Sequence, residues 1–180
     1  MLAAAAMAAP VFAATGGAGV ITPPAGPTGP TGGIGPVAPV TTPLPTAQLS
    51  RDGLTAIPPA AAPPEVKNAV YAANRIAGKP YRYGGGHRRF NDTGYDCSGS
   101  ISFALRGGGM LKRPLDSRAF ASWGERGKGQ WITVYTNPGH AYVVIAGLRF
   151  DTSGPVPRGP RWRKGARSAR AFTARHPVGF

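Results

Sequence analysis

The sequence predicts an α+β fold in which N-terminal helices pack on a small antiparallel sheet. Apolar residues recur at helical spacing in 66–76 and again in 98–105, whereas 131–152 contains three β-rich runs separated by turn signals. Helices followed by an antiparallel meander are typical of α+β domains. A long segment rich in Gly and Pro precedes these elements, and its composition predicts a disordered linker.

The first 63 residues are typical of an export signal followed by a spacer. Residues 1–15 are Ala-rich and apolar and end in small residues, like the hydrophobic part of a secretory signal, and the run is too short to predict a stable membrane span. No Lys or Arg precedes Arg51, so either a longer signal precedes Met1 or the export interpretation is wrong. Residues 16–63 have too little apolar surface to offset the entropy of ordering. We therefore predict a signal-like segment over 1–15, a linker over 16–63 and a secreted or cell-wall-associated protein.

Three helices are predicted after the linker. The first is amphipathic, starts near Pro64 and ends before Gly78 and Pro80. The second runs over 98–105 and ends at the three glycines 107–109. The third follows the capping residues at 116–117 and continues to about Trp123.

Strands are predicted over 131–135, 140–146 and 148–152, with turns at 137–139 and at Gly147. The remaining residues, 157–180, form a basic extension, since every charged residue from Arg158 onward is Lys or Arg. We expect this extension to be partly ordered and to add an edge strand within 171–177.

Cys97 is the only cysteine of the chain, and it lies where the second predicted helix begins. Unpaired N–H groups and the positive end of the helix dipole lower the pKa of a thiol at such a position. An inert buried cysteine is the alternative interpretation, but Asp96, Ser98 and Gly99 are poor neighbours for a core residue. The position therefore predicts a nucleophile.

A cysteine nucleophile needs a base within hydrogen-bond reach, and the chain has three histidines. His87 lies in a polar loop beside glycines, where a surface position or a substrate contact is expected, and His176 lies in the basic extension. His140 begins a strand directly after a turn, so the sheet can point it rigidly at a helix terminus. We predict that His140 is the base.

Asp151 is the candidate for the third group, which orients the imidazole. With a two-residue turn at 146–147, Ile145 pairs with Leu148, and Asp151 lies diagonal to His140 on the same sheet face. A two-residue turn at 147–148 keeps Asp151 on that face, whereas a three-residue loop presents Thr152 instead. A salt bridge or turn cap is the other role open to Asp151.

Together these motifs resemble the NlpC-type family of cell-wall cysteine peptidases. The resemblance rests on Pro-Tyr-Arg-Tyr-Gly-Gly at 80–85, Asp-Cys-Ser-Gly at 96–99 and the strand that His140 begins. It implies a papain-like core over 64–156 that cleaves peptide bonds in peptidoglycan stems, commonly between D-glutamate and the diamino acid. It also implies Cys97 as nucleophile and His140 as base, with Tyr81, Asp96 and Ser98 lining the site, and we expect His87 to contact the substrate as well.

The sequence departs from the family pattern in ways that indicate a divergent branch. The family usually has a Gly-Asp pair before the histidine strand, where this chain has Gly-Lys-Gly-Gln-Trp at 127–131. His, Asn or Gln is usual as the third catalytic residue, and the stretch at 85–90 is longer and more basic than a typical insert.

The function predicted from these residues is a secreted cysteine peptidase of peptidoglycan stem peptides. Two alternatives remain open: a non-catalytic wall-binding module of the same fold, and an amidase or acyl transferase that uses the same thiol. A net charge of +14 suits anionic wall polymers as further partners, whereas nucleic acid is not expected beside an export signal. We predict a monomer without cofactor or metal, because one Cys and three dispersed His provide no ligand spacing.

Overall fold

The computed structural model describes residues 43–154 and 158–180, and it has the α+β architecture that the sequence predicts. Its helices are α1 (Pro64–Ile76), α2 (Cys97–Gly107) and α3 (Ser117–Phe120). A short hairpin consists of β1 (Gln48–Leu49) and β2 (Ala56–Ile57). The main sheet consists of β3 (Glu125–Arg126), β4 (Ile132–Asn137), β5 (His140–Ile145), β6 (Leu148–Asp151), β7 (Arg161–Arg163) and β8 (Thr173–His176), in the order β3-β8-β4-β5-β6-β7. All its strand pairs are antiparallel.

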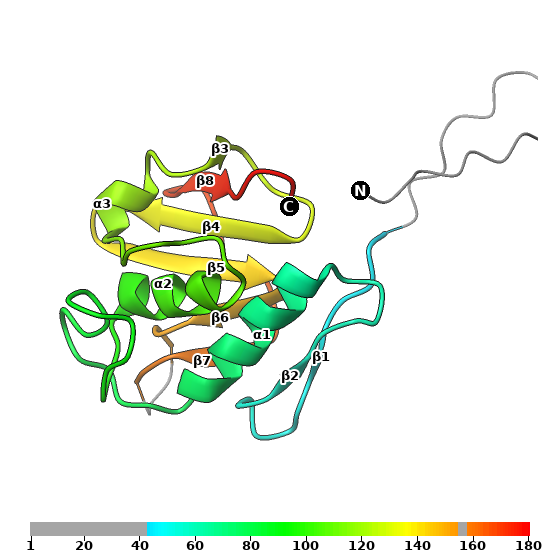
Figure 1. The fold of residues 1–180 in the computed structure, drawn as a ribbon, viewed down its shortest axis with the longest axis horizontal. Coiled ribbons are helices and arrows are strands. Elements are labelled where there is room, and N and C mark those ends of the chain that lie inside the picture. The colour runs from blue at the N-terminus through cyan, green and yellow to red at the C-terminus, as the bar shows by residue number, and fades with distance from the viewer. Residues whose placement is uncertain (1–42, 155–157) are drawn as a thin grey trace, which may run out of the picture. The chain divides into compact units, whose positions relative to one another are not determined.

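Helices α1 and α2 lie against each other and cover one face of the sheet (Figure 1). Helix α1 has Pro64 in its first turn and buries the predicted apolar face, Val66, Ala69, Val70, Ala73 and Ile76. Gly107 lets the end of α2 approach α1, because a Cβ at that position would overlap the side chain of Ala72. This contact fixes α2, the helix that Cys97 begins.

The predicted meander is confirmed by strands β4, β5 and β6. Ile145 pairs with Leu148, so the connection is the two-residue turn at Ala146 and Gly147. Both turn residues have positive φ, 46° and 78°, as a tight turn between twisted strands requires. Along β5 the residues Ala141, Val143 and Ile145 are fully buried, while His140 and Val144 on the opposite face are partly exposed.

The C-terminal extension is part of the sheet, because it supplies both β7 and β8. The predicted edge strand is β8, but it lies between β3 and β4 and is therefore internal. Trp162 on β7 is buried, with its ring centroid 4.9 Å from that of Phe150, and its Nε1–H donates to Asn74 Oδ1 at 2.8 Å. The predicted third helix is shorter than expected. It ends at Phe120, and turns continue the chain to Trp123.

Part of the predicted linker is also ordered. The hairpin of β1 and β2 lies within 16–63. The Asn74 side chain holds it against α1, accepting from Ala56 N and donating to Ala56 O, both at 2.9 Å. Ala47 N donates to Ala146 O at 2.8 Å and ties this segment to the turn after β5. The predicted signal-like segment over 1–15, and the linker up to residue 42, lie outside the described residues. Within the described residues, no helix combines the length and apolar character needed to cross a membrane.

Candidate active site

Cys97 is the first residue of α2. Asp96 and the glycines at 84–85 hold this helix terminus in place. Asp96 caps the helix, accepting from Gly99 N at 2.8 Å. Its other carboxylate oxygen accepts from Gly84 N at 3.0 Å. A Cβ on Gly99 would overlap the carbonyl oxygen of Gly85, so glycine is required where the loop at 80–86 crosses the first turn of the helix.

The thiol of Cys97 interacts with His140 on β5. Burial raises the pKa of Cys97, but hydrogen bonding with the His140 side chain and the Ala141 backbone outweighs burial and lowers it overall. Burial also opposes the charge on His140, yet hydrogen bonds to Asp151 and Cys97 raise the pKa of its imidazole to about 9. Both shifts favour transfer of the thiol proton to the imidazole.

Asp151 lies on the sheet face of His140, where the strand parity predicts it. His140 Nε2–H donates to Asp151 Oδ1 at 2.9 Å, and the carboxylate side chain has no exposed surface. Since Nε2 is engaged, Nδ1 is the ring nitrogen that remains for Cys97. Asn137 fixes the start of the strand, because its Oδ1 accepts from His140 N at 2.8 Å. Sequence reasoning missed this role of Asn137, although its place before the Pro138–Gly139 turn is a signal for it.

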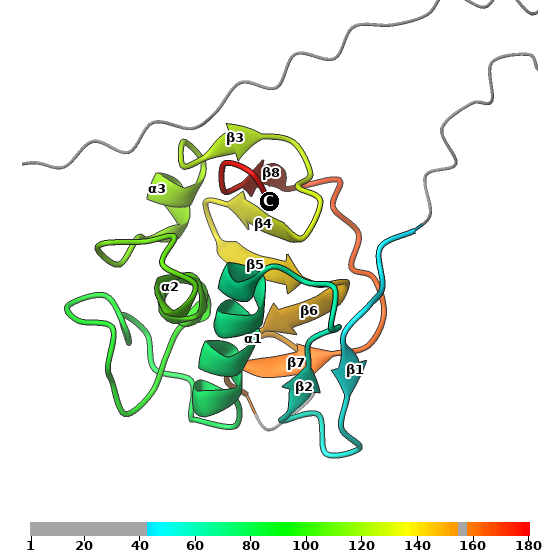
Figure 2. The same cartoon turned by 45° about the vertical axis from the view of Figure 1, so that its right-hand side comes forward.

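Two residues of the C-terminal extension also reach this group, and sequence reasoning did not identify them. Arg167 donates from Nη1 to Asp151 Oδ2 at 3.1 Å and to the hydroxyl of Ser153. The ring of Phe172 packs edge-on against His140, with 6.4 Å between centroids. In Figure 2 the sheet lies between α2 and the segment that links β7 to β8, the segment that carries both residues. The only sequence signal for Arg167 is its basic character.

The four residues predicted to contact substrate line the same hollow as Cys97. This hollow of about 390 Å³ is bordered by Tyr81, His87, Asp96 and Ser98, together with residues at the start of α3 and in the β4–β5 turn. A second hollow of about 270 Å³ borders His140, Ser153 and Arg158. Tyr81 lines both hollows, and we call the two hollows together the groove.

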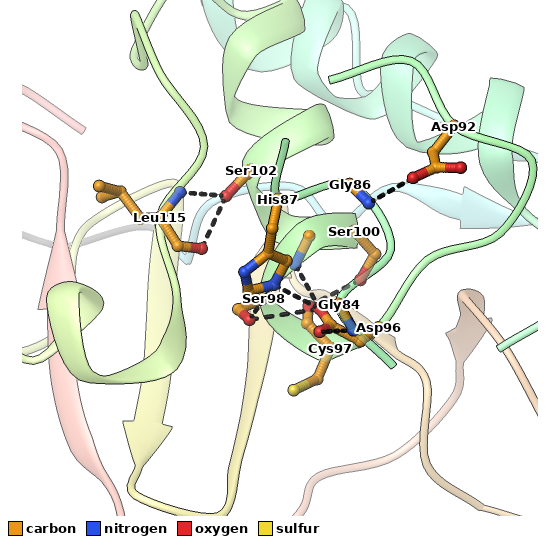
Figure 3. A network of polar contacts seen from close by, with 11 residues as sticks. Gly84, Gly86, His87, Asp92, Asp96, Cys97, Ser98, Ser100, Ser102 and Leu115 are labelled. Atoms are coloured by element: carbon orange, nitrogen blue, oxygen red, sulfur yellow. Dashed lines mark hydrogen bonds and ion pairs between the residues drawn. The ribbon is translucent and has the colours of Figure 1, made fainter. Parts of the chain in front are cut away.

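His87 forms a second histidine–carboxylate pair with Asp96. Its Nε2–H donates to Asp96 Oδ1 at 2.9 Å, and Ser98 Oγ lies 3.1 Å from the same nitrogen. The hydrogen bond to Asp96 raises the pKa of His87 against the opposing effect of burial. Figure 3 shows the Cys97 sulfur pointing away from this network. The two histidines therefore interact with different parts of the site.

Within the described residues, no group of three or more potential metal ligands comes together. The chemistry that these residues can perform is nucleophilic attack by the thiolate and proton transfer by the imidazole. Cys97 and Ser98 are the first two residues of α2, so their backbone N–H groups have no intrahelical acceptor.

Comparison with known proteins gives a similarity to solved structures alone. No model of a protein family matches the chain, and no curated protein matches it. An NlpC/P60 family protein from Bacillus cereus is 15% identical, with a TM-score of 0.49, over 65% of this chain and 41% of that protein. NlpC/P60 is the family that the motifs resemble.

Two further similar structures are those of the proteins RipB and RipA. The peptidoglycan hydrolase RipB from Mycobacterium tuberculosis is 20% identical with a TM-score of 0.47, over 62% of this chain and 64% of that one. The resuscitation promoting factor interacting protein RipA is 17% identical with a TM-score of 0.47, over 75% of this chain and 70% of that one. The chain thus spans less than two thirds of the first two structures, and at these identities its activity must be argued from its own site.

Proposed function

We propose that this chain is a cysteine hydrolase that cleaves peptide bonds in peptidoglycan stem peptides. The observation that carries the proposal is that His140 contacts both Cys97 and the buried Asp151, with the thiol at a helix N-terminus. Such an arrangement lowers the thiol pKa, holds the proton on the imidazole and keeps the ring in one orientation.

The reaction follows from these positions. The Cys97 thiolate attacks the carbonyl carbon of the scissile bond, and the N–H groups of Cys97 and Ser98 stabilise the oxyanion. His140 transfers its Nδ1 proton to the leaving amine as the C–N bond breaks, which leaves a thioester. Water then attacks the thioester while His140 takes a proton from it, and the acid product leaves as the thiolate–imidazolium pair is restored.

Peptidoglycan as substrate is supported by the motif resemblance and by the name of the hydrolase RipB. The groove also suits an extended peptide, because Tyr81 stands between its two hollows and His87, Asp96 and Ser98 form a polar wall. Export through residues 1–15, and a catalytic domain beginning near residue 64, belong to the same proposal.

The test is digestion of purified peptidoglycan, with the fragments identified by mass spectrometry. Wild-type protein should release stem-peptide fragments, and Cys97→Ala should lose that activity by ~10³-fold or more. Circular dichroism and thermal unfolding of Cys97→Ala check that its fold is intact. Release of fragments by folded Cys97→Ala at the wild-type rate would overturn the mechanism. Products joined to a new amine rather than to water would identify a transferase.

A further inference from the structure

A group of arginines occupies the sheet face opposite α1 and α2, next to the catalytic carboxylate. Arg149 on β6 lies directly across from Arg163 on β7, and Asp151 lies across from Arg161. Phe150 and Trp162 alternate with them and are buried in the core. Successive side chains of a strand point to opposite faces, so Arg149, Arg161 and Arg163 share one face. We call these three residues, together with Arg167 after β7, the arginine face.

The arginine face has far more positive than negative charge. Asp151 is the carboxylate that contacts it, with Arg167 Nη1 at 3.1 Å and Arg149 Nε at 3.6 Å from Oδ2. Within the described residues, Arg161 and Arg163 form no ion pair. Burial lowers the pKa of Arg163, Asp151 opposes that effect, and repulsion from Arg149 and Arg161 adds to it. Like charges placed directly opposite each other on neighbouring strands destabilise a sheet.

Several guanidinium nitrogens of this face are buried without a hydrogen-bond partner among the described residues. They are Nε of Arg149, Nε of Arg161, and both Nε and Nη2 of Arg163. A buried donor without an acceptor costs the full desolvation of that group, and more when the group is charged. Side-chain repulsion and unsatisfied donors at one place suit the binding of an anion there.

The surroundings of Arg163 are consistent with a site that holds its guanidinium in place. Gly154, at φ +124°, lies so close to that group that a Cβ there would be 2.9 Å from Cζ. The carboxylate of Asp151 accepts from His140, Ser153 and Arg167. Within the described residues it forms no ion pair with Arg161 or Arg163.

We propose that the arginine face binds a phosphate-type oxyanion. Guanidinium groups donate two parallel hydrogen bonds to such oxygens, and a tetrahedral oxyanion offers acceptors to several arginines at once. The arginine face does not line the hollow that contains Cys97, and the proposal does not depend on which bond the thiol cleaves. The phosphate comes from solution, from a phosphate-containing polymer or from a lipid headgroup, and binding measurements distinguish these sources.

The first measurement is thermal unfolding of the full chain in phosphate and in chloride at equal ionic strength. Phosphate at ten times its Kd should raise the Tm of the wild type by about 4 °C. Arg163→Gln should lose most of that shift, and its Tm in chloride should equal or exceed the wild-type value because an unsatisfied buried cation has been removed. Arg51→Gln removes the same charge from an exposed turn and should keep the whole shift.

The second measurement is direct binding of three probes: inorganic phosphate, a glycerol phosphate oligomer and vesicles that contain phosphatidylglycerol. Binding that Arg163→Gln weakens at least about five-fold, and that Arg51→Gln leaves unchanged, supports the site and identifies its source. Arg161→Gln replaces Arg163→Gln if the latter does not fold. The proposal is overturned if no probe binds, or if the variants in the arginine face and at Arg51 lose binding equally.

Discussion

Two histidine–aspartate pairs flank the thiol, and they differ in position and exposure although their hydrogen bonds have the same length. In both, Nε2 of the histidine lies 2.9 Å from Oδ1 of the carboxylate. The pair of His140 and Asp151 stands on the sheet, with 19% and 0% of the side chains exposed. The pair of His87 and Asp96 joins a loop to a helix terminus, with 29% and 7% exposed. We expect the catalytic role of each histidine to depend on what its other imidazole nitrogen faces.

The two carboxylates make the difference clearer. Asp96 accepts from backbone N–H groups of Gly84 and Gly99, so it holds the loop and caps the helix as well as contacting His87. Asp151 accepts from side chains, namely those of His140, Ser153 and Arg167, and from the N–H of Ser153. We therefore assign the first carboxylate to the shape of the site and the second to its proton chemistry.

The largest expected difference between the pairs comes from removing each histidine. His140→Ala should lower kcat by ~10³-fold or more, because it removes the base and the partner of the thiolate. His87→Ala should lower kcat/KM by less than about ten-fold, since it removes a wall of the groove. Steady-state kinetics on a stem peptide compares them, and equal losses in two folded variants would abolish the distinction.

Changing the carboxylates should separate activity from stability. Asp151→Asn should lower kcat by roughly 10²-fold or more, and it should move the alkaline limb of kcat/KM from about pH 9 toward the ordinary value for His. The sign follows because loss of the negative charge destabilises the imidazolium.

Asp96→Ala, by contrast, should lower the free energy of unfolding by about 1–2 kcal/mol through loss of the helix cap. Urea unfolding measures this change, and pH–rate profiles measure the effect of Asp151→Asn. An unshifted alkaline limb in Asp151→Asn would contradict the role of this carboxylate.

A smaller effect is expected from Arg167, which contacts Asp151 but neither member of the pair of His87 and Asp96. Its positive charge stabilises the thiolate and destabilises the imidazolium, so Arg167→Gln should shift both limbs of the pH profile to higher pH. The expected loss in kcat/KM is about two- to five-fold. Arg167→Lys keeps the charge and should keep both limbs in place. If Lys and Gln variants shift alike, the effect is structural rather than electrostatic.

Sequence reasoning identified the pair of His140 and Asp151 because the patterns that place these two residues are local in the sequence. Helical spacing predicts α1 and α2, and the parity of a two-residue turn places Asp151 on the face of His140, as the pairing of Ile145 with Leu148 confirms. Family resemblance directed attention to Tyr81, Asp96 and Ser98, which do line the hollow beside Cys97.

The remaining features depend on contacts between distant segments. Strands β7 and β8 have only three and four residues, so neither provides a clear alternating pattern, and the placement of Arg167 against Asp151 follows from how they join the sheet. The pairing of His87 with Asp96 depends on a loop whose path is set by positive φ at Gly84 and Gly86, which no spacing rule predicts.

Because Cys97 is the only cysteine, alkylation by iodoacetamide reports on this thiol alone. The rate of alkylation as a function of pH tests the thiolate–imidazolium pair directly. We predict that folded wild-type protein reacts with a midpoint well below pH 8.5, the ordinary thiol value, and that His140→Ala moves the midpoint up while His87→Ala leaves it nearly unchanged. A wild-type midpoint at or above pH 8.5, unchanged in His140→Ala, would contradict the account.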